Sequence, residues 1–239
     1  DAADPDGLQG TIAYSKGQMF LEYLEHAFGR DTFDEFLAAY FQEFAFGTIT
    51  TEQFLDYLDT ELLSQEGAPL TRAQVEAWTY GPGLPEDALV PVSTNLDSAA
   101  VMAASWADGE ISLDEIPVDD WSPQATIHFI NSLPDDLSRE KLAELDAAWS
   151  LSETRNAEIG RTWFIQVATR RYTDAYDALE AHLNRYGRGR LIAPVYYALA
   201  NNGEDRELAL ELFERAKSAY HPIAAAWIAG ALGVQDASR

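Results

Sequence analysis

Apolar residues recur at helical spacing from Ala13 to Phe46, and this spacing predicts two amphipathic helices, over residues 13–28 and 32–45. Gly29 is expected to end the first helix with a left-handed cap, and Asp31 to cap the second. The predicted buried faces are Ala13, Gly17, Phe20, Leu21, Leu24, Ala27 and Phe28, then Phe33, Phe36, Leu37, Tyr40, Phe41 and Phe44.

Capping signals predict the helices that follow. Thr50 with Gln53, and Thr71 with Gln74, have the three-residue spacing of a capping box. The segment 80–94, "YGPGLPEDALVPVST", is rich in proline and glycine and cannot continue a helix, so we expect it to join two structural units. Further helices are predicted near 95–107, 123–133, 138–150, 153–170, 173–186, 191–202, 204–219 and 221–232.

These elements predict an all-α fold, because almost no stretch alternates with the period of two that marks a strand. The late helices pair as antiparallel hairpins stacked in sequence, which favours an α-solenoid of the armadillo or HEAT kind, although no strict repeat period is visible. The expected organisation is a first domain over 1–85, a linker over 86–94 and a second domain over 95–239.

The charge narrows the classes of partner. The 239 residues carry a net charge of -24, and 24 of the 40 acidic residues precede position 122. Such an acidic surface argues against nucleic acid or an anionic membrane as a partner. No run of about 18 apolar residues is present, so no membrane-spanning helix is expected. The compartment stays open between the cytoplasm and export to the periplasm.

The residues taken alone offer little chemistry. There is no cysteine, and none of the four histidines belongs to an HExxH string or pairs with another at i, i+4, so the chain has no zinc-site helix. No GxSxG motif or phosphate-binding glycine loop is present. Tyr14 stands at the start of the first helix, where its hydroxyl either points into a cleft or packs against neighbouring backbone.

Several segments, in order along the chain, resemble the zinc aminopeptidase family of aminopeptidase N and leukotriene A4 hydrolase. The first group resembles the later part of the thermolysin-like catalytic domain, and the second the helical C-terminal domain. The segments are "DPD" (4–6), "YSKG" (14–17), "GTITTEQFLDYL" (47–58) and "YGPGLP" (80–85), then "LSETRNAEIGRTWF" (151–164), "GRGRLIAPVYYAL" (187–199) and "YHPIAAAWIAGALGV" (220–234).

The resemblance implies roles for five residues. Tyr14 matches the tyrosine that stabilises the oxyanion of the tetrahedral intermediate, which suits a neutral phenol at pH 7. Arg188 and Arg190 match the basic pair that binds the carboxylate of a short peptide, the alternative being that both offset the acidic surface. Asp6 matches an acidic residue of the substrate pocket, or is a solvated loop residue. Gln9 stands where the vertebrate leukotriene hydrolase has a tyrosine, which favours peptide over lipid-epoxide hydrolysis.

The resemblance also implies that the family's zinc ligands, and the glutamate that reads the substrate's free amino group, precede residue 1. The chain is therefore expected to be part of a longer zinc aminopeptidase, to bind no zinc by itself and to be inactive alone, with the remaining N-terminal part and short peptides as its partners. The alternative is a stand-alone helical scaffold that docks another protein through the aromatic residues of 13–46.

Overall fold

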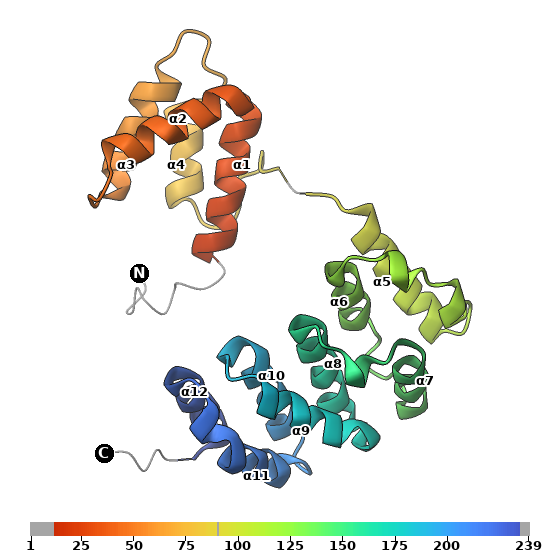
Figure 1. Cartoon of the computed structure of the whole chain (residues 1–239). Helices are drawn as coiled ribbons and strands as arrows, with labels where there is room; N and C mark the ends of the chain where they lie inside the picture. Colours follow the sequence, from red (N-terminus) through yellow and green to blue (C-terminus); the bar gives the residue numbers. More distant parts are fainter. Residues whose placement is uncertain (1–11, 90, 235–239) are drawn as a thin grey trace. The chain divides into compact units, whose positions relative to one another are not determined.

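The computed structural model of the protein describes residues 12–89 and 91–234, and every regular element in these ranges is helical, which confirms the predicted all-α class (Figure 1). The chain divides into two compact units, residues Asp1–Val92 and Ser93–Arg239. Each unit has its own cluster of buried apolar side chains. The two units are therefore described separately.

Unit 1 contains four helices around one aromatic-rich core. The helices are α1 (Gly17–Phe28), α2 (Arg30–Glu43), α3 (Thr51–Leu58) and α4 (Arg72–Tyr80). A π-helical turn over Ile12–Lys16 leads into α1, and a second one over Asp59–Leu63 extends α3. The buried core residues are Tyr23, Leu24, Phe33, Phe36, Leu55, Leu58, Leu62, Leu70, Val75 and Trp78.

The connection between α1 and α2 is shorter than the sequence predicted. Gly29 alone reverses the chain, with φ 81° and ψ 155°, a conformation outside the left-handed helical region and open essentially to glycine only. Gly29 therefore stands at the N-cap of α2, which begins at Arg30 without a side-chain capping bond. The prediction that Asp31 caps this helix is wrong, because Asp31 already lies in its first turn.

The predicted buried faces are confirmed in their centres and wrong at their edges. Leu24, Phe33 and Phe36 are buried, as the spacing indicated. Leu21 and Phe41 are 39% and 68% exposed, so the apolar stripe that reaches the core is narrower than the run of apolar residues. Tyr23 is buried in their place, because its hydroxyl finds a carboxylate partner in Asp87.

Both predicted capping boxes of unit 1 are confirmed. The Thr50 hydroxyl accepts the N–H of Gln53 at 3.2 Å, and the Gln53 side chain accepts the N–H of Thr50 at 2.8 Å. Thr71 and Gln74 repeat the arrangement at the start of α4. These local bonds satisfy helix N–H groups that would otherwise lack partners, which is why the sequence alone locates the two helix starts.

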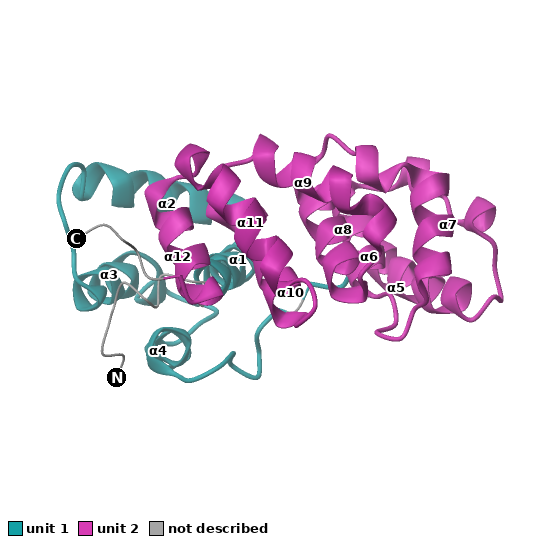
Figure 2. Cartoon of the chain, turned by 90° about the horizontal axis from the view of Figure 1, so that it is seen from below, with its two compact units in different colours: residues 1–92 teal, residues 93–239 magenta. Residues whose placement is uncertain are grey.

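Unit 2 is a stack of helices in chain order, and Figures 1 and 2 show them succeeding one another along the unit. Contacts run from α6 to α8, from α8 to α10 and from α10 to α12, while α9 and α11 contact each other in a second row. This layered packing is the predicted α-solenoid. The helices are α5 (Thr94–Ala107), α6 (Pro123–Asn131), α7 (Arg139–Trp149), α8 (Ala157–Arg170), α9 (Tyr176–Arg185), α10 (Gly189–Asn201), α11 (Arg206–Ala216) and α12 (Pro222–Leu232).

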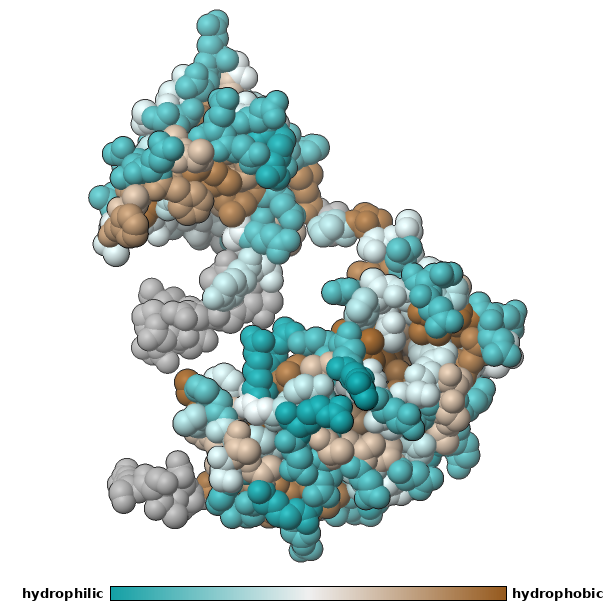
Figure 3. Space-filling model, viewed as in Figure 1, coloured by the Kyte–Doolittle hydropathy of each residue, from teal (hydrophilic) through white to brown (hydrophobic). Residues whose placement is uncertain are grey.

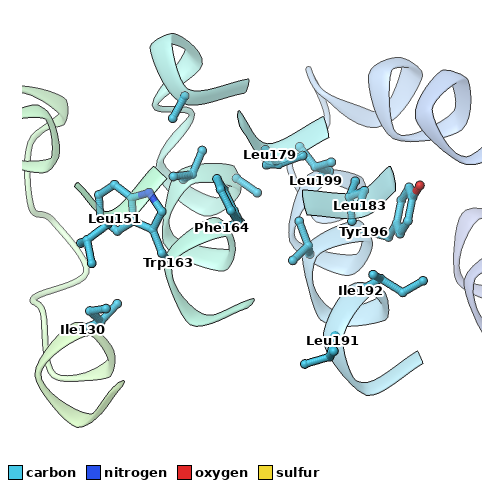
Figure 4. Close-up of a cluster of buried hydrophobic side chains, with 14 of the residues drawn as sticks. Ile130, Leu151, Trp163, Phe164, Leu179, Leu183, Leu191, Ile192, Tyr196 and Leu199 are labelled. Carbon is cyan, nitrogen blue, oxygen red and sulfur yellow. The ribbon is translucent and has the colours of Figure 1, made fainter. Parts of the chain in front are cut away.

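The middle of this stack is held by large buried side chains from α8, α9 and α10 (Figure 4). Trp163 of α8 is fully buried, and its indole N–H donates to the Ser152 hydroxyl at 3.0 Å. Tyr196 of α10 is fully buried too, and its hydroxyl lies 2.8 Å from that of Tyr220, which donates to the Leu183 carbonyl at 3.0 Å. The polar atoms of both rings are therefore paired inside an apolar core.

A buried carboxylate ties three elements of unit 2 together. Asp205, at the start of α11, accepts bonds from the Arg171 Nε at 3.0 Å and from the Tyr176 hydroxyl at 2.7 Å. Burial, and then the bond to Asp205, raise the pKa of Tyr176 far above its usual range, so the phenol remains a donor. Arg171 also contacts the exposed Glu204, so one guanidinium binds one buried and one exposed carboxylate.

This pair of neighbouring acids gives a matched test. Asp205→Ala leaves the charge of Arg171 and the hydroxyl of Tyr176 without their buried partner, and we expect a loss of about 3–5 kcal/mol in the free energy of unfolding. Glu204→Ala removes an exposed partner and should cost less than about 1 kcal/mol. Urea unfolding followed by tryptophan fluorescence measures both, because only Trp78 of the six tryptophans lies in unit 1. Equal losses in the two variants would contradict the assignment.

Candidate functional site

Tyr14 lies in the π-helical turn Ile12–Lys16 that precedes α1, and its side chain is 76% exposed. The alternative that this tyrosine packs into the structure as a helix-start residue finds no support in its exposure. Tyr14 therefore presents its hydroxyl group at the surface of unit 1.

The start of α1 is fixed by the glycine- and proline-rich segment 80–89. Lys16, two residues after Tyr14, donates from its Nζ to the carbonyl oxygen of Gly81 at 2.7 Å. Further along α1, the Tyr23 hydroxyl donates to Asp87 Oδ2 at 2.6 Å. Burial, and then the bond to Asp87, raise the pKa of Tyr23 to about 12, while the Tyr23 bond lowers the pKa of Asp87. Two bonds between distant residues thus hold this segment along α1.

A pocket of about 460 Å³ lies between these two segments. Lys16 and Met19 line it from the α1 side, and Gly81, Pro82 and Leu84 line it from the other. Apart from the Lys16 ammonium, whose bond to Gly81 is already made, these side chains are apolar or small. The pocket therefore has a largely apolar lining. Two of its lining residues, Ser15 and Lys16, directly follow Tyr14 in the sequence.

A larger pocket, of about 790 Å³, lies in unit 2 and contains both predicted arginines. Arg188 stands at the N-cap of α10 and Arg190 lies in its first turn. The opposite wall is the start of α12, including His221, Ile223 and Trp227. The two walls come from residues 187–190 and 219–227, which are separate in the sequence and lie together in the folded unit.

The glycines that flank Arg188 are required by close packing. A Cβ at Gly187 would lie 3.0 Å from the carbonyl oxygen of Ala219, and the Gly187 carbonyl accepts the N–H of His221 at 3.3 Å. A Cβ at Gly189 would lie 3.1 Å from Ala224 and from the Trp227 ring. The backbone around Arg188 therefore lies directly against the start of α12, and larger residues at either glycine would push the walls apart.

The two arginines differ in their surroundings. Arg190 contacts the carboxylate of Glu158 on α8, and Glu158 also pairs with Arg161 at 3.5 Å. Arg188 is exposed, and within residues 12–89 and 91–234 no carboxylate pairs with it. Arg188 is thus available for an incoming anion, whereas Arg190 partly answers the acidic surface, as the alternative interpretation held. A carboxylate can accept two parallel bonds from one such guanidinium.

His182 of α9 contacts the first turn of α10. It is buried, its Nε2 lies 3.4 Å from the Leu191 carbonyl, and its ring packs on Phe164 and Tyr186. Burial lowers the pKa of His182, so the ring is neutral at pH 7. This histidine is a structural residue of the core, as expected for a histidine on an apolar helix face.

Some expected features fall outside what the structure describes. Asp6 and Gln9 lie in residues 1–11, which are not among the described residues. Within the described ranges, no three His, Asp or Glu side chains gather as a metal site. None of the helices described is both long and apolar enough to cross a membrane.

Trp227 and Ile223 line the arginine pocket, and no motif in the sequence marks them as site residues. The helix that carries them, "PIAAAWIAGAL", is apolar on every side, so its pattern does not distinguish a buried from an exposed face. A tryptophan among alanines was the available signal. Its meaning depends on the packing of α12 against the start of α10.

Unit 1 presents an exposed tyrosine hydroxyl, and unit 2 is an α-solenoid that contains the arginine pocket. Two family models match the chain, the M1 peptidase domain over residues 1–77 and the leukotriene A4 hydrolase C-terminal domain over residues 121–232. The chain belongs to the M1 peptidase family, in the branch with a leukotriene A4 hydrolase-type C-terminal domain.

Individual relatives agree. The chain is 30% identical to leucine aminopeptidase 2 of Pyricularia oryzae, over 98% of this chain and 39% of that protein. It is 30% identical to leucine aminopeptidase 2 of Lodderomyces elongisporus, over 94% and 38%. The structure of yeast leukotriene A4 hydrolase in complex with bestatin is similar with a TM-score of 0.80 and 26% identity, over 96% of this chain and 40% of that one. The chain thus spans about two fifths of the length of the relatives it matches.

The glycine packing gives a matched pair of variants. Gly187→Ala brings a methyl group against a backbone carbonyl that cannot move by itself, so we expect a loss of about 1–3 kcal/mol in the free energy of unfolding. Gly203→Ala has open space around it and should change stability by less than about 1 kcal/mol. Urea unfolding measures both. If Gly187→Ala were as stable as Gly203→Ala, the close contact between the α10 and α12 starts would be refuted.

Proposed function

We propose that this chain forms part of the active site of a zinc metallo-aminopeptidase that removes N-terminal residues from short peptides. The observation that carries the proposal is the pocket at Arg188, an exposed guanidinium without a carboxylate partner among the described residues, in an otherwise strongly acidic chain. Membership of the M1 peptidase family and relatives that are named leucine aminopeptidases support the reaction class.

Tyr14 is assigned the role of oxyanion donor. Its exposed hydroxyl can donate a hydrogen bond to the oxygen that becomes negative when the peptide carbonyl is attacked. A phenol O–H donates such a hydrogen bond without itself carrying a charge. The Lys16 bond to Gly81 positions the turn that carries Tyr14, which reduces the reorganisation needed during reaction.

Arg188 is proposed to bind the C-terminal carboxylate of the peptide. A bidentate bond to this group fixes both the position and the direction of a short substrate. Arg190 serves as a supporting charge, since its guanidinium already contacts Glu158. The proposed substrates are di- to tetrapeptides that carry a free C-terminal carboxylate.

The zinc ion of the family belongs, in this proposal, to residues outside this chain, because the sequence has no HExxH string. The role of Tyr14 and of the arginines does not depend on ligands from this chain. Asp6 is proposed to line the substrate pocket. Gln9, at the position of a tyrosine in the vertebrate leukotriene hydrolase, is proposed to leave peptide hydrolysis as the activity.

A second candidate function is a helical interaction module. Unit 1 exposes several large apolar side chains, among them Phe41 at 68% and Phe46, and Figure 3 shows apolar surface over α1 and α2. Exposed patches of this kind mark protein interaction sites. An intact-mass measurement beside the cloned reading frame distinguishes the two functions. A frame that starts far upstream supports the enzyme, and a frame that starts near residue 1 supports the module.

Tyr14→Phe tests the oxyanion donor in the longer enzyme. The substitution removes the hydroxyl and keeps the ring, so kcat should fall about 10²–10³-fold while KM changes little. Tyr80→Phe is the matched control, because Tyr80 is also exposed and its hydroxyl bonds to Glu52. Steady-state kinetics on a tripeptide measures both, and an unchanged kcat for Tyr14→Phe would remove the assigned role.

Arg188→Gln tests the carboxylate anchor in the same enzyme. Loss of the charged bond should raise KM about 10- to 100-fold for a tripeptide with a free carboxylate. The same peptide with an amidated C-terminus should be hydrolysed equally by both forms. Arg215→Gln is the control, since Arg215 pairs with Glu180 outside the pocket. Equal KM values for the two peptides in the unsubstituted enzyme would contradict the anchor.

The 239-residue chain alone should neither retain stoichiometric zinc nor hydrolyse aminoacyl substrates. Metal analysis after purification, and an assay with an aminoacyl p-nitroanilide, measure the two properties. One zinc per chain together with turnover would overturn the assignment of the metal site to other residues.

A further inference from the structure

The pocket at Arg188 has an apolar wall that carboxylate binding does not use. Trp227 and Ile223, both on α12, are 57% and 54% exposed within it. In contrast, Trp106 and Trp163 of the same unit are fully buried. Two large apolar side chains open to one pocket provide a surface that gains free energy when it is covered.

The Trp227 ring is held in place beside the arginine. A Cβ at Gly189 would lie 3.1 Å from the ring atoms Cε3 and Cζ3, so the edge of the indole packs against the backbone of the residue that follows Arg188. Glycine at this position allows that approach. The ring therefore presents its remaining surface to the pocket in a fixed orientation, without needing to be ordered by a ligand.

The charge around the pocket selects the kind of occupant. The residues that line it include Arg188 and Arg190 and no acidic residue, in a chain with 40 acidic and 16 basic residues. Because Arg190 already contacts Glu158 of α8, Arg188 supplies the charge that is left without a partner among the described residues. An anion is therefore attracted here, whereas most of the surface repels it. An occupant that satisfies both walls has a carboxylate and, one or two bonds away, an apolar group.

We infer that Trp227 and Ile223 bind the side chain of the last residue of the peptide, so that the pocket selects substrates with an apolar or aromatic C-terminal residue. The inference rests on the proposed function, since it takes the carboxylate of that residue to be bound by Arg188. The C-terminal residue carries its carboxylate and its side chain on the same carbon atom. Arg188 then binds the carboxylate of this residue, and Trp227 and Ile223 select its side chain by size and apolarity.

The test is a binding experiment on the 239-residue chain, with N-acetyl-phenylalanine and N-acetyl-glycine as probes and the indole N–H signal of Trp227 as the NMR readout. The unsubstituted chain should bind N-acetyl-phenylalanine at least about tenfold more tightly than N-acetyl-glycine. Trp227→Ala should bring this ratio to near one and leave the affinity for N-acetyl-glycine unchanged. Because this variant lacks the indole signal, its binding is measured from the shifts of backbone signals in α10. Ile223→Ser should lower the ratio partly, and Trp227→Phe should restore it.

Arg188→Gln separates this inference from the proposed function. If Arg188→Gln abolishes binding of both probes and Trp227→Ala leaves the ratio unchanged, only the side-chain site is refuted. If Arg188→Gln leaves binding of both probes unchanged, or if neither probe binds the unsubstituted chain, the carboxylate anchor is refuted with it. Val101→Ala, an exposed apolar residue of α5, controls for general surface effects. Thermal unfolding checks that each variant keeps its fold.

Discussion

The close approach of the α10 start to the α12 start is the contact on which the arginine pocket of unit 2 depends. Two glycines allow it, since Gly187 lies against the Ala219 carbonyl and Gly189 against the Trp227 ring. With side chains at these positions the two backbones would separate, and the walls of the pocket with them. The stack of α8 and α10 below supplies the rigidity, through fully buried residues such as Trp163 and Tyr196. A packing constraint thus sets the position of Arg188.

In unit 1, hydrogen bonds and not close backbone packing fix the position of the candidate residue Tyr14. The segment 80–89 is rich in proline and glycine and forms no regular helix beyond Tyr80. Two hydrogen bonds hold it, from Lys16 to the Gly81 carbonyl and from Tyr23 to Asp87. Both partners on the helix side belong to the start and middle of α1. The same bonds that order the segment therefore also fix the turn that carries Tyr14, which links a structural feature to the proposed donor.

Charge plays three separate roles in this chain. The excess of acidic residues gives the chain a net charge of -24, which argues against polyanionic partners. Inside unit 2 the carboxylate of Asp205 is paired and ordered by Arg171 and Tyr176, so burial does not leave it unsatisfied. At the pocket the pattern reverses, and Arg188 has no partner among the described residues. The unpaired charge, rather than the number of charges, points to function.

The sequence by itself determined the all-helical class and the helix starts at Thr50 and Thr71, because caps and helical periodicity depend on neighbours within a few positions. The candidate site residues came from resemblance to a family and remain a proposal. Only the tertiary structure decided which apolar residues are covered, as the exposed Leu21 and Phe41 show. It also distinguished Arg190, which contacts Glu158 from 32 residues away, and revealed the Trp227 wall. Such contacts join segments far apart in the chain, and no local pattern records them.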